Sequence, residues 1–281
     1  MQLQRDGFSG SWRVVAPERI KRLERVAQGC PFCAGNEDVT PAETFRINGE
    51  HSAGWAARSF PNLYPLAAVH EVLVPTPRHA TSLRELTVDE LVVMLELWCG
   101  RLEFHADQAG DDAYVHLFVN DGAQAGASVP HVHAQLMRVP TSEYLSGLLD
   151  RVRDPETCAA CTLVNTAEGD ERCVSRVDGL VLAVPEVPRL SGSMILTPEA
   201  HKHPFGAGRA LAGMMHTALR ALPPHDFNVV VVIHPASPVH WYIEFIPRHG
   251  QLAGAELGLN ITVSMTDPRA DAEAARTRIR S

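Results

Sequence analysis

The sequence predicts an α+β fold made of two tandem copies of one unit, residues 1–150 and 151–281. Three observations predict it. Segments with strand and helix periodicity follow one another in the same order in both halves. A C-x-x-C pair stands near the beginning of each unit, and in each unit two widely spaced histidines follow it. Recurrence of one order of elements and motifs along a chain is the sequence signature of a structural repeat.

The first unit is expected to alternate strands and helices. Residues 87–107 have helical periodicity, and Thr87 with Glu90 three positions later forms a capping box. The loop at 121–128 is rich in glycine and alanine, and the helix at 141–154 begins with Thr141 or Ser142 as its N-cap. Strands are expected at 71–76, at 114–120 and around 131–135.

The second unit repeats this order with shorter connections. Residues 179–185 and 192–198 are expected to be strands, and 208–222 a helix. Two further strands follow at 227–234 and 240–247, and the chain closes with a helix at 268–281. Proline, glycine and small residues mark the joins between them.

Composition limits the kind of protein this is. A chain of 281 residues with 45% hydrophobic content can bury a large core, as one large domain or two ordinary ones. A net charge of −8 argues against a nucleic-acid partner, because proteins that bind nucleic acids usually carry a stripe of basic residues. No apolar run reaches the length of a membrane span, and the N-terminal residues lack the apolar core of a signal peptide. We therefore expect a cytoplasmic protein with no membrane partner.

The H-x-H-x-Q stretch at 131–135 is the first candidate functional motif. In a strand, the period of two places a polar set on one face and an apolar set on the other. The polar set is His131, His133 and Gln135, and the apolar set is Val132, Ala134 and Leu136. A hairpin with one solvated face would show the same pattern, so the rest of the chain has to decide.

Cysteine and histidine spacing predicts two structural zinc sites. A C-x-x-C pair lets two thiolates reach one tetrahedral ion, and in the cytoplasm paired cysteines favour a metal over a disulfide. A thioredoxin-like redox pair is the alternative for Cys30 and Cys33, but that motif opens a helix, whereas a polar loop follows here. The two expected ligand sets are Cys30, Cys33, His79 and His131, and Cys158, Cys161, His201 and His240.

Comparison of the two copies separates a catalytic candidate from the ligands. Where the first copy has His131, His133 and Gln135, the second has His240, Tyr242 and Glu244. A duplicated metal site keeps its ligands, but a catalytic group is needed only once, so His133 is the candidate nucleophile or base. A neutral imidazole is nucleophilic near pH 7 and suits phosphoryl chemistry. The preceding loop supplies Asn120, Gly126 and Ser128, which can bind phosphate oxygens.

With these motifs in place, the chain resembles the galactose-1-phosphate uridylyltransferase family of the histidine-triad superfamily. The resemblance runs over nearly the whole chain, through "WRVVAPERIKR", "CPFCAGNED", "RSFPNLYP", "VPTPRHATSLREL", "FVNDGAQAGASVPHVHAQ" and "AGAELG". It implies two tandem histidine-triad-like units, each an antiparallel sheet flanked by helices. It also implies zinc as the cofactor and a homodimer.

Position by position, the resemblance implies roles for individual residues. His133 would be the nucleotidylated nucleophile, and Gln135 would hydrogen-bond the phosphoryl oxygens with Ser128 beside it. Asn120 and Gly126 would line the phosphate path. Asn62, Leu63 and Tyr64 would border the base and ribose, and Cys30, Cys33, His79 and His131 match the zinc set of the family.

The favoured activity is ping-pong nucleotidyl transfer between a nucleotide sugar and a sugar 1-phosphate, as in UDP-glucose:hexose-1-phosphate uridylyltransferase. The alternatives are an ADP-sugar phosphorylase or adenylyltransferase, a dinucleotide hydrolase, and a zinc-stabilised nucleotide-binding module without turnover. A binding module needs no nucleophile, so the combination of His133, Ser128 and Gln135 argues against it. The best-known uridylyltransferases use a lysine- and aromatic-containing stretch on the sugar phosphate, and residues 249–262 contain neither residue type. In the family's counterpart of strand 240–247 two histidines are common, and this chain has only His240.

Overall fold

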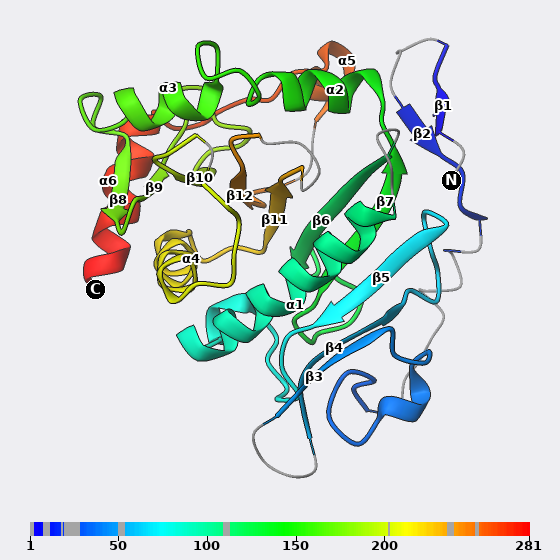
Figure 1. The fold of residues 1–281 in the computed structure, drawn as a ribbon. Coiled ribbons are helices and arrows are strands. Elements are labelled where there is room, and N and C mark those ends of the chain that lie inside the picture. Colours follow the sequence, from blue (N-terminus) through cyan, green and yellow to red (C-terminus); the bar gives the residue numbers. More distant parts are fainter. Residues whose placement is uncertain are drawn as a thin grey trace.

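The computed structural model describes residues 3–7, 12–17, 19, 29–49, 54–108, 113–201, 203–234, 239–250 and 253–281. One antiparallel sheet of ten strands runs through the molecule, in the order β3-β4-β5-β7-β6-β11-β12-β10-β9-β8 (Figure 1). Helices flank this sheet, so the expected α+β class is confirmed. Part of the "WRVVAPERIKR" stretch, residues 18 and 20–22, lies outside the described residues.

Each half of the chain supplies five strands of the sheet. The first half contributes β3 (Phe45–Asn48), β4 (Trp55–Pro61), β5 (Val69–Val74), β6 (Ala113–Asp121) and β7 (Ala134–Pro140). The second contributes β8 (Cys173–Val177), β9 (Leu180–Ala183), β10 (Met194–Pro198), β11 (Phe227–Val232) and β12 (Tyr242–Pro247). A separate two-stranded sheet pairs β1 (Leu3–Arg5) with β2 (Trp12–Val14).

The two half-sheets are related by an approximate two-fold axis between β6 and β11. Read from the outer edge inwards, the first half runs β3-β4-β5-β7-β6 and the second β8-β9-β10-β12-β11. At the centre Phe118 pairs with Val230, and these residues in turn pair with Gln135 and Glu244 in the next strands out. The tandem repeat expected from the sequence is therefore present in the strand order and register, while the boundary at 150/151 stays a prediction.

The main core lies between one face of the sheet and the long helices. These are α1 (Val88–Asp107), α4 (Arg209–Ala221) and α6 (Pro268–Arg280), whose apolar residues join one buried cluster with the sheet. Thr87 caps α1, and its side chain and that of Glu90 make the reciprocal bonds of a capping box, as predicted. The opposite face of the sheet is left to carry the site.

Three shorter helices lie between or beyond the strands: α2 (Glu143–Asp150), α3 (Ala159–Thr166) and α5 (Gly254–Leu259). Ser142 rather than Thr141 caps α2, because the Ser142 hydroxyl accepts from the backbone N–H of Leu145. The sequence did not predict β1, β2, β3, β4, β8, α3 or α5. None of the helices among the described residues is both long and apolar enough to span a bilayer.

The H-x-H motif is not in a strand, which corrects the sequence prediction. Strand β7 begins at Ala134, and the backbone N–H of Val132 donates to the carbonyl of Ala80, 2.7 Å away, instead of to a neighbouring strand. The same happens in the second half, where β12 begins at Tyr242 and the N–H of His240 donates to the carbonyl of Val152. The alternation of polar and apolar side chains continues into the loop because Val132 packs in the core while its neighbours do not.

Candidate functional site

A cavity of about 480 Å³ opens on the sheet face opposite the main core. One side is formed by the loop of the first C-x-x-C pair and by the segment after β4. The other side is formed by residues around the H-x-H-x-Q motif. The sequence candidates among the lining residues are His133, Gln135, Ser128, Asn62, Leu63, Tyr64, Cys30 and His79. Segments far apart in sequence therefore converge on one hollow.

The ring of His133 is held in one orientation and one tautomer. Its Nδ1 lies 2.8 Å from the carbonyl oxygen of His131. A carbonyl only accepts, so Nδ1 carries the proton and the neutral ring has its lone pair on Nε2. The ring of Phe32 packs edge-on against it, with centroids 5.2 Å apart. The imidazole is 6% exposed and lines the cavity, which is the arrangement that a nucleophilic histidine needs.

Gln135 is oriented by His70, a residue that the sequence analysis did not single out. The backbone N–H of Leu66 donates to His70 Nδ1, at 3.0 Å, so the proton of the neutral ring is on Nε2. His70 Nε2 in turn donates to Gln135 Oε1, at 3.0 Å. Burial lowers the pKa of His70 to about 4, so the ring is neutral at physiological pH. With its oxygen engaged, the Gln135 amide is left to present its NH₂ donors.

Asn62 reinforces this orientation. Its Oδ1 accepts from the backbone N–H of Tyr64, at 2.9 Å, which turns Nδ2 towards Gln135 Oε1, 3.4 Å away. Leu63, half exposed, and Tyr64 line the same cavity. An apolar wall with a few fixed polar groups is the usual form of a small-molecule site.

In the glycine- and alanine-rich loop at 121–128, Ser128 is the residue that lines the cavity. Ser128 is exposed and lines both this cavity and a larger open cleft of about 980 Å³ behind the loop. Asn120 instead lines that cleft and a depression of about 520 Å³ over the central strands. Gly126, at φ +96°, lies against Asn120, since a Cβ there would be 3.5 Å from Asn120 Nδ2. Asn120 and Gly126 are thus one strand away from His133.

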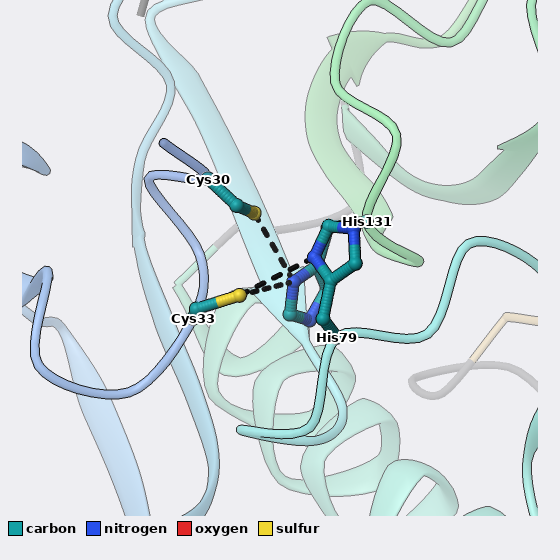
Figure 2. Close-up of side chains that lie close together, drawn as sticks. All are labelled: Cys30, Cys33, His79 and His131. Atoms are coloured by element: carbon teal, nitrogen blue, oxygen red, sulfur yellow. Dashed lines mark hydrogen bonds between the residues drawn. The ribbon is translucent and has the colours of Figure 1, made fainter. Parts of the chain in front are cut away.

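The first Cys and His set gathers as the sequence predicted. One donor atom from each of Cys30, Cys33, His79 and His131 lies within 4.8 Å of all the others. Figure 2 shows the two sulfur atoms facing the two histidine rings. The Nδ1 atom of His131 lies 3.3 Å from Cys30 Sγ, and that of His79 lies 3.3 Å from Cys33 Sγ. Two sulfurs and two nitrogens fit a tetrahedral ion.

The chemistry of these donors also fits a cation. The Nε2 of His131 donates to the carbonyl of Thr76, at 3.1 Å, so its Nδ1 lone pair faces the sulfurs. Burial lowers the pKa of His131 to about 4, which keeps the ring neutral. Burial and the neighbouring Cys30 raise the pKa of the Cys33 thiol to about 11. A bound cation would reverse that shift, because it favours the thiolate.

The second set repeats this geometry in detail. One donor atom from each of Cys158, Cys161, His201 and His240 lies within 4.8 Å of all the others. The Nε2 of His240 donates to the carbonyl of Pro198, at 2.7 Å. Pro198 precedes His201 by three residues, just as Thr76 precedes His79. Cys158 caps α3, so this C-x-x-C opens a helix, unlike the first one.

The side chains that face the cavity in the first half are replaced in the second. Tyr242 takes the position of His133, and burial raises its phenol pKa well above the ordinary value. Glu244 takes the position of Gln135 and pairs with Arg189, whose Nε and Nη2 atoms lie 3.0 Å from the carboxylate oxygens. The second half therefore keeps the Cys and His cluster but has a phenol where the first half has the His133 imidazole.

Two further residues shape the site without having been predicted. Phe32 stands between the two cysteines and packs on His133. The guanidinium of Arg58 is buried over the rings of Trp55 and Phe60 and donates to the carbonyl of Pro31, at 3.3 Å. Arg58 thus anchors the cysteine loop to β4. The sequence offered a signal only for Phe32, through its place inside the C-x-x-C pair.

The chain is similar to known proteins over most of its length. Residues 57–138 match the family model of the HIT domain. The chain is 22% identical to an ADP-glucose phosphorylase of Arabidopsis thaliana over 321 aligned residues, covering 95% of this chain and 90% of the relative. It is 24% identical to a galactose-1-phosphate uridylyltransferase of Thermotoga maritima over 217 residues, covering 72% of this chain and 67% of the relative.

Solved structures show the same fold. The Arabidopsis thaliana ADP-glucose phosphorylase with bound ADP-glucose superposes with a TM-score of 0.76, at 23% identity, over 98% of this chain and 97% of that one. A uridylyltransferase structure superposes with a TM-score of 0.76, at 21% identity, over 100% and 99% of the two chains. The tandem histidine-triad-like architecture is thereby confirmed, and with it the resemblance noted in the sequence.

Asp121, which begins the 121–128 loop, makes a pH-dependent contribution to stability. Burial raises its carboxyl pKa from 3.8 to about 6, although the backbone N–H of Leu83 donates to it at 2.6 Å. A raised folded pKa means that the contribution is fully present below the unfolded pKa and is lost as the pH rises through 6. We expect Asp121→Asn, which keeps an acceptor for Leu83, to remove this dependence.

The measurement is urea unfolding of both proteins at pH 5 and pH 7.5. The wild type should lose about 1 kcal/mol relative to Asp121→Asn over this interval. Asp178→Asn, at an exposed turn, is the matched control and should track the wild type. A constant difference between wild type and Asp121→Asn would show that Asp121 has an ordinary pKa.

Proposed function

We propose that this chain, which resembles the galactose-1-phosphate uridylyltransferase family, is a nucleotidylyltransferase that acts on nucleotide sugars through a nucleotidyl-histidine at His133. The observation that carries the proposal is the fixed tautomer of His133, whose Nδ1–H is bonded to the carbonyl of His131. In that tautomer the ring lone pair is on Nε2, and Gln135 and Ser128 line the same cavity as His133.

The reaction has two half-steps. His133 Nε2 attacks the α-phosphorus of the nucleotide sugar, a P–N bond forms, and the bond to the bridging oxygen breaks to release sugar 1-phosphate. A phosphate oxygen of the acceptor then attacks the same phosphorus and restores the neutral imidazole. The Gln135 NH₂ and the Ser128 hydroxyl donate to the non-bridging oxygens, where charge accumulates. The carbonyl of His131 stabilises the positive charge that the ring acquires.

The two halves of the substrate have separate places. The nucleoside fits the cavity bordered by Phe60, Leu63 and Tyr64, whose walls are mainly apolar. The sugar phosphate lies over Asn120 towards the depression on the central strands, which Arg248 and Glu256 also line. This depression supplies both charged and polar groups for a phosphorylated sugar.

The favoured substrates are UDP-glucose and a hexose 1-phosphate. The second candidate activity is that of an ADP-sugar phosphorylase, which one observation favours. The alignment with an ADP-glucose phosphorylase covers 95% of this chain. In that reaction class inorganic phosphate replaces the sugar phosphate as acceptor. Both activities use the same first half-step, so one experiment can test the shared chemistry and separate the acceptors.

We expect the wild-type protein to become covalently labelled by α-³²P UDP-glucose or ADP-glucose, with the label stable to base and labile to acid. His133→Ala should take up no label because it lacks the nucleophile. Gln135→Ala should label on the order of 100-fold more slowly, since one transition-state hydrogen bond is lost. The preferred nucleotide identifies the base, and chasing with galactose 1-phosphate, inorganic phosphate or buffer identifies the acceptor.

Two results would contradict this proposal. Equal labelling of His133→Ala would place the nucleophile elsewhere. Turnover without any label, with intersecting rather than parallel initial-rate plots, would mean direct transfer. His216→Ala, at a partly buried position of α4 outside the cavity, is the matched control and should label like the wild type.

We also propose that each Cys and His cluster holds a structural zinc ion. Cys30, Cys33, His79 and His131 would hold one, and the second set the other. When bound, zinc would cross-link the two cysteines of each cluster to its two histidines and would take no part in group transfer. In the first cluster, His131 also supplies the carbonyl that fixes His133, so zinc binding and the catalytic geometry share one residue.

Elemental analysis should therefore find about two zinc ions per chain. Cys33→Ser should lose one ion and most of the labelling activity, and Cys161→Ser should lose one ion and stability. Chelation should lower the melting temperature, because metal binding is coupled to folding. Cys99→Ser, outside both clusters, should keep both ions; retention of two ions in Cys161→Ser would rule out the second site.

A homodimer is the third part of the proposal. The segment from α5 onwards exposes apolar side chains at alternate positions next to the central depression: Leu257, Leu259, Ile261, Val263 and Met265. Exposed apolar surface of this kind is typical of an interface.

Sedimentation velocity should give a dimer, and Leu259→Glu should give a monomer. Val187→Glu, at a position 85% exposed, should stay dimeric, and a monomeric wild type would refute the dimer.

A further inference from the structure

The loop at 121–128 is held by the half of the protein that lacks the candidate nucleophile. The backbone N–H of Gln124 donates to Asp226 Oδ2, at 2.7 Å. Gly122 lies so close to Asp226, at φ +91°, that any Cβ there would collide with the carboxylate. Asp226 directly precedes β11, so a side chain from the second half fixes the middle of a first-half loop.

Asn228, two residues further along, links the strand that precedes this loop to the middle of the loop. Its Nδ2 donates to Asn120 Oδ1 and to the carbonyl of Ala125, each at 2.9 Å. Asn120 and Asn228 are direct partners in the β6–β11 ladder. The Asn228 amide therefore spans from the last residues of β6 to the loop that follows it.

These bonds also decide which way the Asn120 amide points. Because Asn120 Oδ1 accepts from Asn228, its Nδ2 is turned away from β11 and towards Gly126, where a Cβ would be 3.5 Å away. The segment after Gly126 continues to Ser128 at the cavity. Inside the loop, the backbone N–H of Ala127 donates to the carbonyl of Gly122. Gly122 lies against Asp226, so this bond connects Asp226 to the segment that leads to Ser128.

We infer that Asp226 and Asn228 are positioning residues that set the 121–128 loop, and through it the Ser128 hydroxyl and the Asn120 amide, for transfer at His133. The inference rests on the proposed function. Neither side chain lines the cavity with His133, and Asp226 does not line the central depression, whereas Asn228 does. They act through the loop, since a displacement of about 1 Å in a positioning group can cost on the order of 100-fold in rate.

The decisive variant is Asn228→Asp, which keeps the shape of the side chain but removes the donor. A carboxylate there would face Asn120 Oδ1 and the carbonyl of Ala125, both acceptors, so the loop would be repelled. Asp226→Ala removes the acceptor for Gln124, whereas Asp226→Asn keeps one oxygen for that bond. Asn165→Asp, exposed on α3, is the matched control.

The readout is the single-turnover rate of covalent labelling by the preferred α-³²P nucleotide sugar. We expect Asn228→Asp and Asp226→Ala to label on the order of 10- to 100-fold more slowly at saturation. The half-saturating concentration should be unchanged in Asp226→Ala, because Asp226 lines neither the nucleoside cavity nor the central depression. Asp226→Asn should recover most of the rate. Melting temperature and metal content should match the wild type, and amide hydrogen exchange at Gln124 should be faster in Asp226→Ala only.

The outcomes separate the two proposals. If Asn228→Asp labels as fast as the wild type, the positioning role is refuted while the proposed function stands. If the wild type takes up no label at all, the proposed function fails. A uniform loss of rate, melting temperature and metal would overturn positioning in favour of a folding role, as would failure of Asp226→Asn to recover the rate lost in Asp226→Ala.

Discussion

The antiparallel pairing of β6 with β11 is the contact on which the rest of the structure depends. It joins two five-stranded halves into one sheet, so both can share the core under α1, α4 and α6. It also brings the C-terminal end of β6 beside the beginning of β11, where Asp226 and Asn228 meet the loop that leads to Ser128. An isolated first half would lose these contacts.

The two copies have kept the same frame and diverged in the side chains that face the open side of the sheet. In each, two cysteines and two histidines converge, and one histidine donates to a carbonyl three residues before the other. Beside this cluster, one copy has an imidazole and an amide, and the other a phenol and an ion pair. The first half therefore supplies the candidate nucleophile, and the second half supplies side chains that hold the 121–128 loop.

The C-x-x-C loop of the first half links the proposed metal site to the candidate nucleophile. Cys30 and Cys33 face His79 and His131, while Phe32 between them packs on His133. His131 has two roles, since its ring faces the sulfurs and its carbonyl accepts from His133. Movement of this loop would therefore displace two supports of the candidate nucleophile together, and a metal ion at the proposed site would restrain that movement.

The sequence by itself determined the α+β class, the duplication and the partners in both Cys and His clusters. Periodicity and motif spacing report local structure, and the second copy acted as an internal comparison that separated His133 from the ligands. The sequence also predicted α1 with its capping box, because a capping box depends only on residues three positions apart. It misplaced the H-x-H motif in a strand, because the pattern of side chains continues beyond the end of β7.

Only the tertiary structure decided what surrounds these residues. The roles of His70, Arg58, Asp226 and Asn228 depend on hydrogen bonds to residues 27 to 108 positions away, which no local pattern encodes. The Gln135 amide has its orientation because a buried imidazole donates to its oxygen, and the tautomer of that imidazole is set by the backbone of Leu66. Such directions are properties of packed side chains, so they exist only once the sheet has brought the strands together.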